Sequence, residues 1–111
     1  MIFIRFFRDE KYLIGFEIKG HAEFKNGRKV IEDKIICSSV SMLAQSTLYG
    51  IGEVLKYSPK YEVENGFVKC DISDFNEEHK INCQVLLKTM EVTVYKLLEE
   101  ESYNKYITLM D

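Results

Sequence analysis

The chain has 111 residues, which is enough for one compact domain, and we expect residues 1–111 to form that single domain. Hydrophobic residues make up 46% of the chain, and only six residues are Gly and one is Pro, which excludes disordered and fibrous proteins. The net charge of −3 disfavours direct binding of nucleic acid, because no excess of positive charge attracts the phosphate backbone.

The apolar runs and the cysteines indicate where the protein works. The longest apolar runs span a few residues, far below the ~20 needed to cross a bilayer, so we expect no membrane span and no signal peptide. Three cysteines without a Cys-x-x-Cys pair do not make a disulfide framework or a zinc site. They favour a reduced, cytoplasmic location, and the sequence predicts no metal or other cofactor.

The first third of the chain predicts an antiparallel hairpin followed by a loop. Residues 1–8 and 12–19 are rich in β-branched and aromatic residues, and the polar residues 9–11 between them suit a turn. Residues 21–34 have no clean periodicity and contain Asn26-Gly27, so they predict a mobile loop.

From Ile35 the pattern changes to that of an amphipathic helix. Apolar residues recur every three or four positions, at Val40, Leu43, Ala44, Leu48, Ile51 and Leu55. We expect the helix to end near residues 56–58, because Pro59 restricts the residue before it. Gly50 and Gly52 weaken its second half, or allow a neighbouring element to approach closely.

The second half of the chain repeats the hairpin and helix. Residues 60–64 and 67–72 flank Asn65-Gly66, a pair that suits a tight hairpin turn. Asp74 or Asn76 can cap the next helix. Its expected inner stripe consists of Ile81, Leu86, Leu87, Met90, Val94, Leu97 and Leu98. Acidic residues 99–101 predict fraying at the end of this helix, and residues 105–110 predict a last strand.

The element order is therefore β-β-α-β-β-α-β. It predicts a two-layer α+β domain with a mostly antiparallel sheet and two helices on one of its faces. The uncovered sheet face or a helix flank is available for dimerisation.

Cys37 is the candidate nucleophile. Cys70 falls in a strand and Cys83 in the second helix, where a thiol is most often a small buried hydrophobe. Cys37 lies where the loop is expected to turn into the first helix, and the dipole of a helix start favours the thiolate. The backbone amides of Cys37 and Ser38 would then be available to hold an oxyanion.

His21 is the candidate base. It follows Gly20 at the end of the second predicted strand, from which its side chain can reach the start of the first helix. A Cys–His pair is the minimum for covalent acyl transfer. The other histidine, His79, lies among charged residues at a helix start, which favours a solvated face over a ligand or a base.

Two segments carry a family resemblance: Gly20-His21-Ala22 and, after a loop, residues 35–41 (IICSSVS). Together they resemble the signature of the ribosomal-processing cysteine protease (Prp) family, also called YsxB-like proteins, whose plan fits essentially the whole chain. The resemblance implies a cysteine endopeptidase that removes an N-terminal extension from the precursor of large-subunit ribosomal protein L-twenty-seven. It implies His21 and Cys37 as the catalytic dyad, with Ser41 supporting them one helical turn from Cys37. It also implies a homodimer and a loop that moves on substrate binding.

Two departures from the family pattern concern the loop. His21 and Cys37 are 16 positions apart, more than in many relatives, but a longer loop changes closure entropy by well under ~1 kcal/mol. Lys34 stands where the family usually has an acidic residue, and Asp33 or Glu32 can take its place.

Two other functions are compatible with the sequence. One is a non-catalytic, ribosome-associated binding module that keeps the fold without turnover. The other is an RNA-contacting assembly factor that uses the basic loop residues Lys25, Arg28 and Lys29, whose binding would collapse as salt rises.

Overall fold

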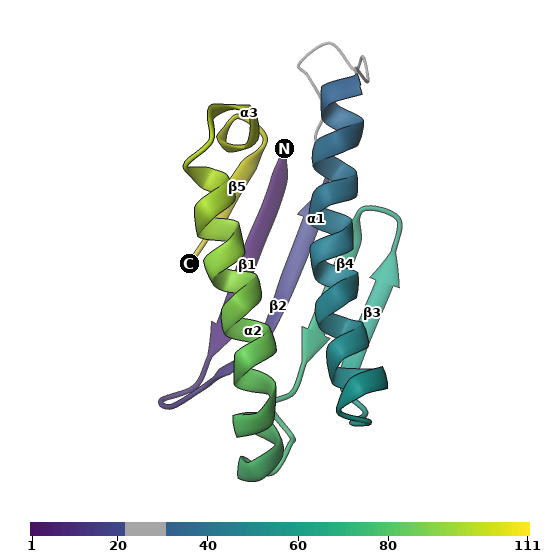
Figure 1. Cartoon of the computed structure of the whole chain (residues 1–111), viewed down its shortest axis with the longest axis vertical. Helices are drawn as coiled ribbons and strands as arrows, with labels where there is room; N and C mark the ends of the chain where they lie inside the picture. Colours follow the sequence, from purple (N-terminus) through teal and green to yellow (C-terminus); the bar gives the residue numbers. More distant parts are fainter. Residues whose placement is uncertain (22–30) are drawn as a thin grey trace.

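The computed structural model describes the backbone of residues 1–21 and 31–111, and the side chains of residues 1–21 and 34–111. Figure 1 shows a single sheet with two long helices lying along it. The described strands are β1 (Ile2–Arg8), β2 (Leu13–Gly20), β3 (Lys60–Glu64), β4 (Phe67–Asp71) and β5 (Ile107–Met110). The described helices are α1 (Ile31–Tyr49), the π-helical turn η1 (Gly50–Val54), α2 (Glu77–Leu98) and the single turn α3 (Glu101–Asn104).

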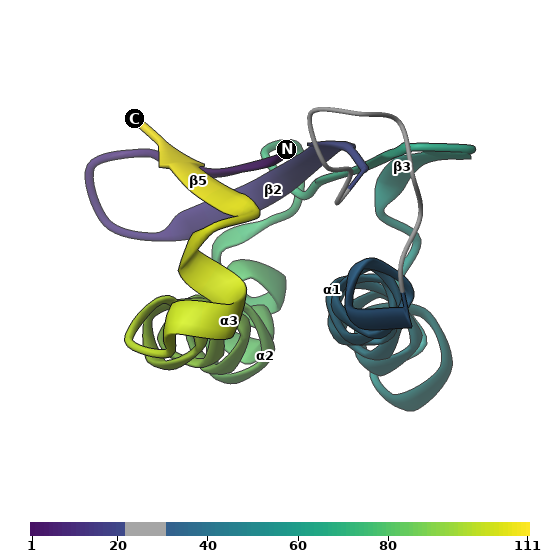
Figure 2. The same cartoon turned by 90° about the horizontal axis from the view of Figure 1, so that it is seen from above.

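The sheet has the order β3-β4-β2-β1-β5. The neighbouring pairs are antiparallel except β1 and β5, which are parallel. The chain reaches β5 from β4 through α2 and α3. Both long helices cover the same face of the sheet, as Figure 2 shows. This confirms the predicted two-layer α+β fold with a mostly antiparallel sheet.

The alternation of side chains along the strands decides which face is covered. Ile4 pairs with Ile18, and Phe16 pairs with Cys70, so these side chains share the face beneath the helices. All four are buried. Phe3 pairs with Lys19 on the opposite face, where Phe3 is 41% exposed.

The first helix begins earlier than the sequence predicts. It starts at Ile31 and not at Ile35, so the predicted loop of residues 21–34 is too long at its C-terminal end. Residues 22–30 of that loop, including Lys25, Arg28 and Lys29, lie outside the described residues. The helix ends about where expected, since Leu55 is the cap of η1 and Lys56 adopts a φ of 64°. This left-handed residue reverses the chain before Pro59.

The two glycines near that end have different surroundings. A Cβ on Gly50 would lie 2.7 Å from Cδ1 of Leu86, so α2 approaches η1 closely here and a larger residue would force the Leu86 side chain to shift. A Cβ on Gly52 would meet nothing within 4 Å. The predicted close approach is therefore confirmed at Gly50 and is wrong at Gly52.

The second hairpin and the second helix follow the sequence closely. Gly66 has a φ of 77°, the left-handed conformation that favours glycine at the second central position of a turn. Asn76 caps α2, and its side chain accepts a hydrogen bond of 2.8 Å from the backbone N–H of His79. Ile81 is 50% exposed, so its place in the inner stripe is wrong.

Gln84 occupies the inner face of α2. Its side chain accepts a bond of 2.9 Å from the backbone N–H of Leu13 and donates one of 2.8 Å to the carbonyl of the same residue. These two bonds join α2 to the start of β2.

One described helical segment, Lys34–Val54, is long and apolar enough to cross a membrane by length and composition alone, contrary to the expectation of no such segment. The core helix of a globular protein can also reach the mean hydropathy of 1.2 found here, and one third of this segment is buried. Ile36, Val40 and Ala44 are buried in the hydrophobic core that α1 shares with the sheet. The packing therefore accounts for the apolar composition of this helix.

Candidate active site

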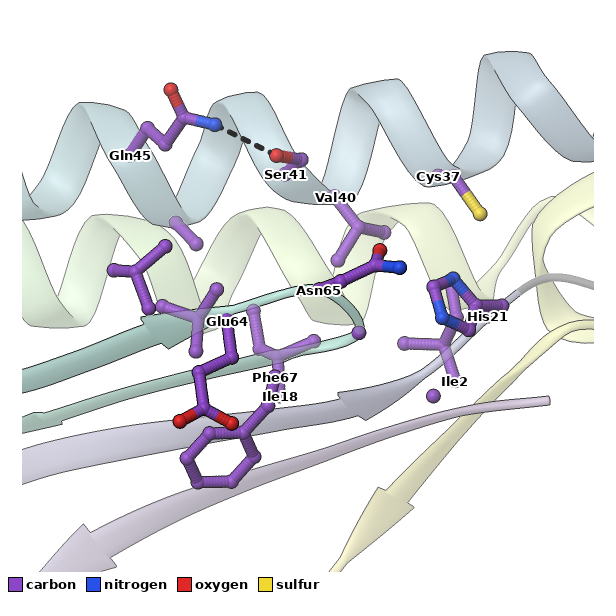
Figure 3. A pocket seen from close by; sticks show the side chains of 15 residues that line it. Ile2, Ile18, His21, Cys37, Val40, Ser41, Gln45, Glu64, Asn65 and Phe67 are labelled. Atoms are coloured by element: carbon purple, nitrogen blue, oxygen red, sulfur yellow. Dashed lines mark hydrogen bonds between the residues drawn. The ribbon is translucent and has the colours of Figure 1, made fainter.

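A pocket of about 260 Å³ opens between α1, the end of β2 and the β3–β4 hairpin. His21 and Cys37 both line it, although one follows β2 and the other belongs to α1. Figure 3 shows the sulfur of Cys37 pointing from α1 toward the ring of His21. The structure therefore brings the two predicted residues to one pocket, as a thiol nucleophile and its base require.

Two glycines explain how His21 reaches this pocket. Gly20 has a φ of 98°, and a Cβ there would lie 2.2 Å from the carbonyl oxygen of Met1, so only glycine fits between β1 and the histidine. Gly66 lies against the ring itself, because a Cβ there would be 2.5 Å from Nε2 of His21. The other ring nitrogen faces α1 (Figure 3).

Backbone hydrogen bonds fix the same segment. The N–H of Gly20 donates to the carbonyl of Gly66 at 2.9 Å, which joins the end of β2 to the turn of the second hairpin. The amino group of Met1 donates to the carbonyl of His21 at 2.6 Å. The half-buried His21 is thus held between β1 and the β3–β4 turn.

The helix start does not supply the predicted oxyanion site. Because α1 begins at Ile31, Cys37 and Ser38 lie in its second turn, beyond the four N–H groups that a helix leaves without an internal acceptor. The prediction that their amides are available to an oxyanion is therefore wrong. The dipole argument for Cys37 is weakened for the same reason, since that effect falls off within the first turn.

The serines after Cys37 differ in their surroundings. Ser41 lines the pocket one turn beyond Cys37, and its Oγ accepts a bond of 2.8 Å from Nε2 of Gln45. Ser39 donates to the carbonyl of Ile35 at 2.8 Å. Ser38 is exposed and does not line the pocket, so the structure brings Ser41 to the site and not Ser38.

Asn65 also lines the pocket, although the sequence indicates it only as part of the hairpin turn. Its side-chain amide points toward His21 and Cys37, as Figure 3 shows. An amide group can donate hydrogen bonds to a developing oxyanion or to a base. The neighbouring Glu64 points its carboxylate away from α1 in the same view, because residues 64 and 67 pair on the sheet face opposite the helices.

The comparisons with known proteins identify the family of this chain. A family model described as cysteine protease Prp matches residues 1–108. The chain belongs to the cysteine protease Prp family. None of the curated proteins is similar enough to count as a match.

Three solved structures share the family fold with this chain. SMU.848 from Streptococcus mutans has a TM-score of 0.77 at 22% identity, and covers 98% of this chain and 91% of its own. The essential ribosomal processing protease Prp from S. aureus, in complex with a substrate peptide, has a TM-score of 0.75 at 21% identity. That match covers 99% of this chain and 98% of the S. aureus chain. The same protease with a covalently linked product peptide has a TM-score of 0.73 at 22% identity, and the match covers 98% of this chain and 97% of the S. aureus chain.

The other two cysteines of this Prp-family chain are poor nucleophiles. Cys70 and Cys83 are buried. Burial raises the pKa of the Cys70 thiol to about 12 and that of Cys83 to about 11, so both stay protonated near neutral pH. Their predicted role as buried hydrophobes is confirmed. In the described part of the chain, no three His, Cys, Asp or Glu side chains gather as a metal ion would require.

Proposed function

We propose that this chain is a cysteine endopeptidase with Cys37 as nucleophile and His21 as general base. We propose as its substrate the precursor of ribosomal protein L-twenty-seven, from which it removes an N-terminal extension. The observation that carries the proposal is the placement of both side chains in one pocket of a chain from the cysteine protease Prp family. The S. aureus protease has been solved with a substrate peptide and with a covalently linked product peptide, and this supports a peptide substrate for the present chain.

The reaction follows the chemistry of a thiol and an imidazole. The ring nitrogen of His21 that faces α1 takes the proton of the Cys37 thiol, and the thiolate attacks the carbonyl carbon of the scissile bond. The imidazolium of His21 then protonates the leaving amine as the C–N bond breaks. Water, deprotonated by His21, hydrolyses the thioester, releases the extension as an acid and restores the thiol.

The proposal assigns the oxyanion contact to Asn65, because the amides of Cys37 and Ser38 lie inside α1. Substitution Asn65→Asp keeps a turn-forming side chain of the same shape and replaces the amide donor by a carboxylate. We expect kcat to fall about 10²-fold with the fold intact, the usual cost of losing an oxyanion donor. A wild-type kcat in Asn65→Asp would assign the oxyanion to another group.

The experiment that tests the proposal is cleavage of a peptide that copies the N-terminal extension of the ribosomal protein precursor. Mass spectrometry should find one cut with the wild type, none with Cys37→Ala, and at least about 10²-fold slower cutting with His21→Ala. Ser46→Ala is the matched control, since Ser46 is an exposed residue of α1 that does not line the pocket. An uncut peptide with the wild type, or full activity in Cys37→Ala, contradicts the proposal.

Alkylation separates the enzyme from a non-catalytic binding module. An activated Cys37 should react with iodoacetamide near neutral pH much faster than Cys70 and Cys83, whose thiols are buried and protonated. Equal, slow labelling of all three thiols in the folded protein would favour the binding module.

The homodimer and the cytoplasmic location are further parts of the proposal. Figure 2 shows no described helix over the sheet face opposite α1 and α2, where Phe3, Phe7 and Phe67 lie, and this face suits a second copy. No disulfide joins the three cysteines, all of which the structure describes, and this supports a reducing location. Sedimentation velocity measures the dimer directly.

A further inference from the structure

A second hollow, of about 500 Å³, continues from the catalytic pocket along α1 toward its C-terminal end. Gln45 and Val63 line both spaces, so the two form one groove between the helix and β3. We propose that this hollow is a remote subsite that binds a large apolar side chain of the substrate peptide, about five residues from the scissile bond. The inference rests on the proposed function, because it takes the peptide to be a substrate.

The lining of the remote subsite is mostly apolar and aromatic, with Gln45, Glu53 and Ser58 as its polar members. Its walls come from the end of α1, from η1, from the segment before β3 and from β3 itself, namely Leu48, Tyr49, Gly52, Tyr57, Pro59 and Tyr61. Tyr49 is 60% exposed and Tyr61 is 64% exposed, although both are large aromatic residues. Exposed apolar side chains that gather around a hollow mark a binding site, and their chemistry selects an apolar partner group.

Tyr57 makes one wall of the subsite rigid. Its ring stacks on the ring of His79, with 3.9 Å between the centroids, and meets Phe75 edge to face at 5.8 Å. Its hydroxyl accepts a hydrogen bond of 2.7 Å from Nδ2 of Asn82. A wall held in this way does not lose side-chain entropy when a ligand binds.

Gly52 lines the hollow. It belongs to the π-helical turn η1, a form of helix that is frequent at functional sites. Its backbone φ is not in the left-handed region, and a Cβ there would meet nothing within 4 Å. A side chain at this position would therefore project into the open space without disturbing the fold.

The length of α1 gives the position on the peptide. Leu48 follows Cys37 by 11 residues, which corresponds to roughly 16 Å along a helix. An extended peptide covers that distance in about five residues. β3 is the outer strand of the described sheet, so one edge of its backbone is open to a peptide that runs along the groove.

The test compares peptides that each carry a single phenylalanine at one of the positions remote from the cleavage site, on either side of it. The other remote positions are alanine. With the wild type, we expect phenylalanine about five residues away, on one side, to raise kcat/KM roughly tenfold, the gain from burying one large apolar side chain. In Gly52→Leu, which fills the hollow, this gain should fall below about twofold. Ser46→Leu adds the same side chain to the exposed side of α1 and should keep the tenfold gain.

Failure of the subsite and failure of the proposed function give different results. If the wild type cuts the peptides but gains equally little from phenylalanine at every remote position, or if Gly52→Leu keeps the full gain, the subsite is refuted and the peptidase stands. If the wild type cuts none of them, the peptidase is refuted. In that case, fluorescence anisotropy with the same peptides, carrying a fluorescent label, tests the subsite by binding alone. The subsite requires that the peptide with the remote phenylalanine binds the wild type roughly tenfold more tightly, and that Gly52→Leu loses this difference.

Discussion

Substitution Gly66→Ala should inactivate the proposed site although it replaces neither His21 nor Cys37. The added Cβ would lie 2.5 Å from Nε2 and 3.1 Å from Cε1 of His21. Ordinary contacts between heavy atoms begin near ~3.5 Å, so the ring must move by about 1 Å. It can do so by rotating, because the clash is with the end of a side chain and not with backbone. A displacement of about 1 Å in a catalytic group costs roughly 10²-fold in rate, which is the expected fall in kcat/KM.

The cost to stability should be much smaller than the cost to activity. Residue 66 has a φ of 77°, a conformation that costs alanine about 1–2 kcal/mol relative to glycine. Thermal unfolding followed by circular dichroism should therefore show a midpoint lowered by roughly 4–9 °C for a chain of this size. Peptide cleavage at a temperature below both midpoints then measures the effect on the site alone.

Gly66→Asn separates strain in the turn from displacement of the ring. Asparagine tolerates the left-handed conformation better than alanine but carries the same Cβ. We expect it to recover stability and to remain about 10²-fold less active. A folded Gly66→Ala or Gly66→Asn protein with kcat/KM within about threefold of the wild type would show that His21 does not need its place against the turn.

Three further predictions concern stability, each measured by urea unfolding. Gln84→Leu leaves two buried backbone groups of β2 without their partner and should cost about 2–4 kcal/mol. Gly52→Ala should be more stable than Gly50→Ala by about 1–3 kcal/mol, because only the second introduces a clash with α2. Stability should fall as pH rises from about 9 toward 11, since the pKa values of Cys70 and Cys83 are raised by folding and the unfolded thiols ionise first. Cys83→Ala should make that slope shallower, by up to ~1.4 kcal/mol per pH unit. A Gln84→Leu protein as stable as the wild type would contradict the first argument. Equal stabilities of Gly52→Ala and Gly50→Ala would contradict the second. An unchanged dependence of stability on pH in Cys83→Ala would contradict the third.

Local sequence signals were sufficient for most of the fold. Both hairpins follow from alternating apolar residues around polar turns, and Asn76 caps α2 because its side chain can reach the first turn of the helix. The start of α1 was missed for a physical reason. Periodicity reveals a helix only where one face is buried, and α1 begins beyond the end of the sheet in Figure 1.

Features that depend on distant contacts could not be predicted. The sequence shows that Asn65-Gly66 forms a turn, but not that the turn lies against a histidine 45 positions earlier. Gln84 bonds to a strand residue 71 positions away, and nothing in its helical neighbourhood indicates this. The remote subsite combines aromatic residues from three segments of the chain. One of them, Tyr57, directly follows the left-handed residue Lys56.

The position of His21, the proposed base, therefore depends on the second hairpin as well as on the strand that precedes it. His21 follows β2, but its ring packs on Gly66 and the residue before it bonds to the carbonyl of Gly66. Cys37 belongs to a helix that the core holds through Ile36 and Val40. The proposed nucleophile and the proposed base are thus fixed by separate parts of the fold, and a change at the turn should move His21 without moving Cys37. Iodoacetamide tests this separation: Gly66→Ala should slow alkylation of Cys37, because the displaced imidazole takes up the thiol proton less readily. An unchanged alkylation rate, together with lost cleavage, would place the effect of the turn on substrate binding and not on the base.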